Sequence, residues 1–197
     1  MKKIFAVLLA FVLCFAGCSE EKVFVPERGA VENGVYKNSA FGISFEAEPD
    51  WYYLTDSEIA QTMGIAAEEM FGEGTEIESD HIYDMYCVDN KTNATVSVNY
   101  ENVVSAGNIT DEGTYLEIVT GQILSTGAVS GVADVVIGDV EIGGVKIPCL
   151  NIELEVSGTK IYEKIVAKQK GEWMCSITLA SLSETEMEEL VGRISFE

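Results

Sequence analysis

Hydrophobic and polar residues alternate along much of the chain beyond residue 35, and this period of two predicts a protein built mainly from β-strands. The alternation is clearest at 145–156, where Leu150 and Ile152 share one apolar face and Cys149 and Asn151 share the other, polar face. The other predicted strands are 35–37, 41–45, 82–88, 94–100, 135–142, 160–168 and 173–180. Tight turns join most of these strands to their neighbours, and strands joined in this way pair antiparallel.

Apolar residues at helical spacing occur in three further segments. Residues 55–58 (Thr-Asp-Ser-Glu) and 183–186 (Ser-Glu-Thr-Glu) have the spacing of capping boxes, which mark helix starts. The predicted helices cover 56–72, 110–127 and 184–194. The sequence therefore predicts an α+β fold, with one antiparallel sheet of about six to eight strands covered by two or three helices.

The first seventeen residues follow a different pattern, with two lysines and then an apolar run at 4–16. As a helix this run would reach about 20 Å, well short of the roughly 30 Å hydrocarbon core of a membrane. The segment therefore predicts a cleavable signal peptide rather than a membrane-spanning helix.

Residues 15–18 (Phe-Ala-Gly-Cys) resemble the lipobox of bacterial lipoproteins, although Phe15 departs from the usual aliphatic residue. The resemblance implies that residues 1–17 are removed and that Cys18 carries the lipid. Two or more acyl chains give lasting attachment, so we expect the protein on the extracytoplasmic face of the cell membrane. The alternative is an ordinary signal peptide in which Cys18 has no role.

The segment 18–34 contains several acidic residues, Pro26 and two glycines, and we expect it to be a flexible tether. An ordered first strand at 23–25 is the alternative. Residues 35–197 are predicted to form a single domain that folds without the tether as a monomer.

Three short motifs resemble the opening of PsbP/Mog1-like domains, which occur in many bacterial lipoproteins. They are Tyr-Lys-Asn at 36–38, Gly-Ile-Ser-Phe at 42–45 and Pro-Asp-Trp at 49–51. The order of predicted elements is also similar over 35–197. The resemblance implies an α/β/α sandwich that acts as an accessory factor or protein-binding module, and it provides no catalytic residues to carry over.

Composition narrows the classes of function. The chain of 197 residues has 33 acidic against 12 basic residues, a formal net charge of −21. This charge argues against nucleic acid as a partner, because a phosphate backbone requires a basic surface. The body of the protein should also be repelled by an anionic membrane, so the lipid has to hold it there. A hydrophobic content of 47% excludes a disordered chain.

Motifs for catalysis and for cofactors are missing from the sequence. His81 is the only histidine, and neither a nucleophile elbow nor zinc-ligand spacing occurs. Glycine-rich nucleotide-binding loops are also missing. We therefore predict no catalytic residue, no metal ligand and no cofactor. The alternatives are a small extracytoplasmic hydrolase that uses His81 and a solute-binding lipoprotein.

Three cysteines, Cys87, Cys149 and Cys175, remain in the predicted domain, and an odd number cannot pair completely within the chain. Cys175 is expected to be buried as a free thiol, and one disulfide among the three stays open. The acidic stretch Glu73–Asp80 lacks the calcium-loop pattern and is expected to be a solvated loop, with weak calcium binding left open.

Three neighbouring aromatic residues, Trp51, Tyr52 and Tyr53, precede the first predicted helix. They form either a candidate binding patch or part of the core. Together these features predict a non-enzymatic, lipid-anchored module of the cell envelope, with an envelope protein as its candidate partner.

Replacement of the lipobox cysteine tests the anchor. Cys18→Ala should leave the protein without lipid, either as unprocessed precursor or released from the membrane, whereas Cys14→Ala should remain lipidated. Membrane fractionation with mass spectrometry of the N-terminal peptide measures both. A Cys18→Ala protein that is still processed, lipidated and membrane-bound would refute the lipoprotein prediction.

Overall fold

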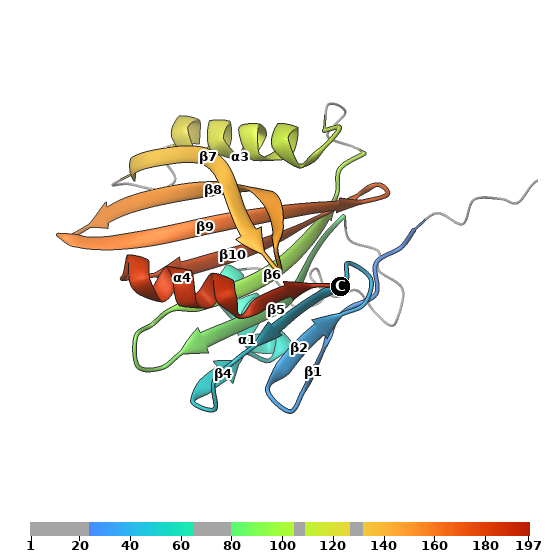
Figure 1. The fold of residues 1–197 in the computed structure, drawn as a ribbon, viewed down its shortest axis with the longest axis horizontal. Coiled ribbons are helices and arrows are strands. Elements are labelled where there is room, and N and C mark those ends of the chain that lie inside the picture. The colour runs from blue at the N-terminus through green and yellow to red at the C-terminus, as the bar shows by residue number, and fades with distance from the viewer. Residues whose placement is uncertain (1–23, 65–79, 105–108, 127–131) are drawn as a thin grey trace, which may run out of the picture.

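The computed structural model describes residues 24–64, 80–104, 109–126 and 132–197 (Figure 1). The strands within these ranges are β1 (Ala30–Glu32), β2 (Val35–Asn38), β3 (Ile43–Glu46), β4 (Trp51–Tyr53), β5 (His81–Asp89), β6 (Thr95–Asn102), β7 (Val132–Ile142), β8 (Val145–Val156), β9 (Thr159–Lys170), β10 (Trp173–Ser181) and β11 (Ile194–Phe196). The helices are α1 (Asp56–Met63), α3 (Glu112–Thr126) and α4 (Glu184–Gly192). The predicted α+β class is confirmed.

Seven strands form the main antiparallel sheet, in the order β4-β5-β6-β10-β9-β8-β7. The strands β7 to β10 follow one another through tight turns. Gly143 and Gly144 between β7 and β8 have φ angles of 60° and 81°, which a two-residue hairpin turn of this hand requires. The local turn signals therefore gave the correct neighbours for this part of the sheet.

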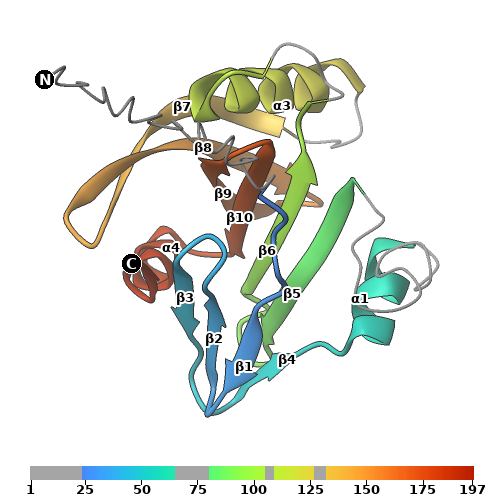
Figure 2. The ribbon, with the colours of Figure 1, turned by 90° about the vertical axis from the view of Figure 1, so that its right-hand side faces the viewer.

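A second sheet of four strands, in the order β1-β2-β3-β11, was not predicted. It lies with α4 on one face of the main sheet, whereas α3 covers the opposite face (Figures 1 and 2). The last strand, β11, pairs antiparallel with β3. The ends of the described chain therefore meet in the same small sheet.

Both faces of the main sheet carry a hydrophobic core. The larger core lies between the two sheets and under α4, and its most buried side chains include Tyr36, Phe41, Phe45, Val96, Val98, Cys175 and Leu190. The smaller core lies under α3 and includes Leu116, Leu150, Ile152, Ala167 and Met174. Since apolar side chains point to both faces of β8 and β10, these strands are buried on both sides.

The carboxylate of Asp84 is completely buried between the two sheets. It accepts hydrogen bonds from the backbone N–H of Gly29 at 2.9 Å and 3.1 Å, from Asn38 Nδ2 at 3.0 Å, from Arg28 Nε at 3.3 Å and from the Tyr36 hydroxyl. Burial and the Asp84 carboxylate raise the pKa of Tyr36, so that this hydroxyl stays protonated and donates. The buried charge is therefore compensated by several donors.

A β-bulge brings Asp84 into this position. The pairing of β5 with β6 shifts between Tyr83 and Met85, so Asp84 is the extra residue. Asp84 and Met85 are both buried, although strict alternation would place them on opposite faces. Gly29 is needed for the approach of the donor segment, because a Cβ atom there would overlap the Tyr36 ring.

The prediction of a flexible tether is wrong for residues 24–34. Arg28 and Gly29 are bound to Asp84, the Phe24 ring packs edge-on against Phe41 with centroids 5.7 Å apart, and β1 pairs with β2. A domain that starts at residue 35 would lose two of the donors to a buried carboxylate. Residues 18–23 lie outside the described ranges.

Two predicted helices end earlier than expected. The capping box at Thr55 is present, but α1 ends at Met63, with Gly64 as a left-handed C-cap; residues 65–72 lie outside the described ranges. The last helix, α4, ends at Gly192, and Ile194 belongs to β11 rather than to the helix. Pairing with β3 thus overrides the helical spacing of Ile194.

The free energy of unfolding should depend strongly on Asp84. Asp84→Ala leaves several buried donors without an acceptor, and we expect a loss of about 3 kcal/mol or more. Asp50→Ala is the matched control, because this carboxylate is exposed and pairs only with Lys91 at the surface, and it should change stability little. Urea unfolding measures both, and equal losses would contradict a central role for Asp84.

Candidate binding cleft

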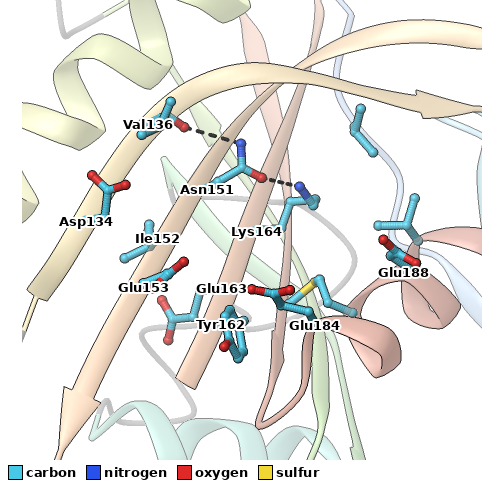
Figure 3. A pocket seen from close by; sticks show the side chains of 13 residues that line it. Asp134, Val136, Asn151, Ile152, Glu153, Tyr162, Glu163, Lys164, Glu184 and Glu188 are labelled. Atoms are coloured by element: carbon cyan, nitrogen blue, oxygen red, sulfur yellow. Dashed lines mark hydrogen bonds between the residues drawn. The ribbon is translucent and has the colours of Figure 1, made fainter. Parts of the chain in front are cut away.

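A cleft of about 410 Å³ lies between α4 and the end of the main sheet formed by β7, β8 and β9 (Figure 3). This volume is within the range of small-ligand and side-chain pockets. Its lining consists of Asp134, Val136, Val140, Asn151, Ile152, Glu153, Tyr162, Glu163, Lys164, Glu184, Met187, Glu188 and Val191. The residues come from three consecutive strands and from α4, and only the packing of α4 on the sheet forms the cleft.

Strand register explains which side chains face the cleft. Val136 lies opposite Asn151, and Asn151 lies opposite Lys164, so these three share one face of the sheet. The helix α4 lies over that face and contributes Met187 and Val191. Ile152 and Glu163 also border the cleft. They are paired with each other, and by alternation their side chains point to the other face of the sheet.

The polar groups at the base of the cleft are bonded to one another (Figure 3). Asn151 donates through Nδ2 to the carbonyl oxygen of Val136 at 3.3 Å, and the Lys164 ammonium donates to the Asn151 side-chain oxygen. Lys164 Nζ also lies 3.9 Å from the Cys149 sulfur. The amide of Asn151 thus fixes the ammonium of Lys164 against the sheet.

The rim of the cleft is acidic. Four carboxylates on the cleft side line it, from Asp134, Glu153, Glu184 and Glu188, and Lys164 is the only basic residue in the lining. Glu184 and Glu188 are exposed on α4, and Asp134 is exposed across the cleft on β7. Glu153 is paired with Lys160 at 3.4 Å. A chain with a net charge of −21 adds to this negative field, so the cleft favours cationic groups.

None of the three cysteines of the domain is suited to nucleophilic catalysis. Cys87, Cys149 and Cys175 are all buried free thiols, so the disulfide left open by the sequence is not formed. Burial raises the pKa of all three, to about 12 for Cys87, and for Cys149 it outweighs the opposing effect of Lys164. Since a thiolate is the reactive species, these thiols are poor nucleophiles. Cys149 was predicted to lie on a polar strand face, and its burial corrects that assignment.

The aromatic triplet predicted as a candidate patch lies on β4, away from the cleft. Trp51 and Tyr53 pack against the core between the sheets, and the Trp51 ring lies 5.7 Å from the Phe45 ring. Tyr52 alternates outward, is 44% exposed and donates to the carboxylate of Glu58. The three rings therefore do not share one surface, and their role in binding stays a prediction.

The histidine singled out in the sequence is not part of the cleft. His81 lies at the start of β5, where its ring is 4.5 Å from the Tyr83 ring. Cys18 and most of the acidic stretch Glu73–Asp80 lie outside the described residues. Within the described ranges, no group of three acidic, histidine or cysteine side chains could hold a metal ion, and none of the helices there could cross a membrane.

Sequence reasoning missed every residue of the cleft. One available signal was Lys164, a basic residue on the same strand face as the core residue Val166. Another was the run Val135-Val136-Ile137, which is more apolar than a strand with one solvated face requires. Neither signal identifies α4 as the opposite wall.

Comparison with known proteins yields similarities of structure. No protein-family model matches the chain, and no curated protein matches it in sequence. Among solved structures, the chain is similar to PsbP (CyanoP) of Synechocystis sp. PCC 6803, with 10% identity over 86% of this chain and 96% of that one and a TM-score of 0.48. It is also similar to LpqN of Mycobacterium tuberculosis, which is involved in cell envelope biogenesis, with 13% identity over 78% and 82% of the two chains and a TM-score of 0.42.

A protein from Bacteroides thetaiotaomicron VPI-5482 is similar over 88% of this chain and 49% of its own length, with 11% identity and a TM-score of 0.42. This chain thus spans about half of that protein. At such TM-scores the similarities carry no argument about activity, and the fold class rests on the strands and helices described above.

Removal of a charge beside the cleft should change how stability depends on pH. Burial raises the pKa of Glu163 above its ordinary value of 4.5. The folded state therefore binds this proton more tightly than the unfolded state, and stability decreases as pH rises from about 4.5 through the raised pKa. Glu163→Gln removes this decrease. The free energy of unfolding of the variant minus that of wild type should therefore be larger at pH 7 than at pH 4.

Urea unfolding at the two pH values measures the effect. Glu117→Gln on the exposed surface of α3 removes the same charge and should show a smaller gain. An unchanged difference between Glu163→Gln and wild type at both pH values would contradict the prediction.

Proposed function

We propose that the protein is a non-enzymatic, lipid-anchored binding module of the cell envelope and that the cleft between α4 and strands β7–β9 receives a partner protein. The observation that carries the proposal is the cleft itself, which combines apolar walls that include Val136, Met187 and Val191 with an acidic rim. Such a site can bind a partner, and its buried thiols with raised pKa values offer no ready nucleophile.

The signal sequence and Cys18 support the lipid anchor. Antiparallel pairing of β2 with β3, and the turn in which Trp51 N donates to Glu48 O at 3.0 Å, support the resemblance of the opening residues to PsbP/Mog1-like domains. That resemblance favours an accessory or protein-binding role over catalysis. Fold alone does not transfer function, so the cleft carries the argument.

The predicted anchor would join the domain at the end of β9 that is far from the cleft. Only residues 18–23 separate the predicted lipid from the first described residue, a reach of at most about 20 Å. Phe24 lies at the far end of β9 from the cleft, since the Lys170 ammonium is 4.8 Å from its ring. Lys164 precedes Lys170 by six residues, about 20 Å along an extended strand. This arrangement leaves the cleft accessible to a partner from the aqueous side.

A photo-reactive amino acid placed in the cleft tests the proposal in intact cells. Val136 is 49% exposed at the cleft, whereas Leu124 is 62% exposed on α3, on the opposite face of the main sheet. With the probe at 136, irradiation should give one discrete adduct of the anchored protein, and the probe at 124 should give none. Mass spectrometry identifies the adduct. No adduct at 136, or the same adducts at both positions, would overturn the cleft as the binding site.

A further inference from the structure

The strand that borders the cleft, β7, has an open edge. It is the last strand of the main sheet, and in the described part of the chain no strand pairs with its outer side. The strand is eleven residues long and contains neither lysine nor proline, which commonly protect such edges, and its one bulge lies at its start, between Val132 and Asp134. Its outer backbone N–H and C=O groups are thus available to an added strand, except the N–H of Val135, which donates to the Asp134 carboxylate at 3.0 Å.

Apolar side chains on β7 are exposed on both faces of the sheet. Val136 on the cleft face is 49% exposed, and Ile137 on the other face is 41% exposed. Adjacent branched residues that remain exposed beside an open edge have no role in the core. An added strand would cover both, because its own side chains would also alternate between the two faces.

The charges around this edge are negative. Asp134, Asp139 and Glu141 lie on β7 itself, and Glu184 and Glu188 lie across the cleft on α4. A second copy of this chain is disfavoured as the added strand, since each copy has a net charge of −21. A basic strand is complementary to the edge.

The shape of the cleft favours lysine or arginine side chains on the added strand. These side chains have an apolar stem and a cationic tip, and they commonly place the stem on apolar surface and the tip at its polar border. In the cleft the stem would lie on Val136 and Met187, and the tip would reach Asp134 or Glu188.

The geometry points to a basic, extended peptide segment of the partner that adds to the outer edge of β7 and inserts alternate lysine or arginine side chains into the cleft. This inference rests on the proposed function, because it names the partner of the same site. Backbone hydrogen bonds to β7 provide affinity, and the cleft selects the basic side chains.

A defined peptide tests the inference on the full chain, reconstituted in nanodiscs of zwitterionic lipid so that anionic lipid does not compete. The probe is a fluorescent eight-residue peptide of alternating lysine and valine. The comparison peptides replace lysine by glutamate, or carry N-methyl groups on alternate residues. Fluorescence anisotropy measures binding, and hydrogen–deuterium exchange measures protection of the β7 amides.

The lysine–valine peptide should bind and slow amide exchange in β7 but not in α3. The glutamate peptide should not bind, and the N-methylated peptide should bind about tenfold more weakly because it loses backbone hydrogen bonds. Asp134→Lys with Glu188→Lys should weaken binding of the lysine–valine peptide by about tenfold. Glu32→Lys with Glu117→Lys, an equal charge change at exposed sites outside the cleft, should weaken it much less.

Equal weakening by the two double variants, or binding without protection of β7, would show attraction to net charge alone and overturn the inference. Failure of the peptide to bind would do the same, as would a peptide-free dimer that protects β7. These results differ from failure of the proposed function, which is shown by the absence of a specific adduct at position 136. An adduct at 136 together with no peptide binding would keep the cleft as the site and reject the basic strand.

Discussion

The buried carboxylate of Asp84 is the constraint on which the arrangement of the two sheets depends. A charge in a protein interior must be compensated by donors, and here the donors come from β2 and from the segment just before β1. Arg28 continues the connection outward through two hydrogen bonds to Asp56, the first residue of α1. One buried group therefore joins the small sheet, the main sheet and the start of a helix.

The same constraint sets where the proposed anchor would join the domain. Because Arg28 and Gly29 are held at Asp84, the chain before them packs at the end of the sheet near the β9–β10 turn, where Phe24 contacts Gly171 and Lys170. A tether that began at residue 35 would allow any orientation at a membrane. A domain fixed from residue 24 onward has fewer orientations, and the cleft lies toward the opposite end of β9.

The cleft results from unequal cover on one face of the main sheet. The four-stranded sheet and α4 together bury the side chains of β5, β6 and β10. Around Val136, Asn151 and Lys164 the cover comes from α4, and the space beside Met187 and Val191 remains open. Lys164 and Asn151, which would be costly in a closed core, satisfy each other at the base of this space. The acidic rim then determines the sign of the charge that can enter.

The local sequence pattern determined much of the secondary structure of this protein. The hairpin at Gly143-Gly144, the capping box at Thr55 and the alternation of β8 each depend on neighbouring residues, and each predicted its element correctly. The antiparallel hairpins of β5 with β6 and of β7 to β10 followed from short turns, whereas the pairing of β6 with β10 did not. The tertiary structure alone decided the pairing of β11 with β3, the bulge that turns Asp84 inward, and the ordered segment before β1. It also decided the cleft, because contacts between residues far apart in sequence leave no period or spacing in the chain.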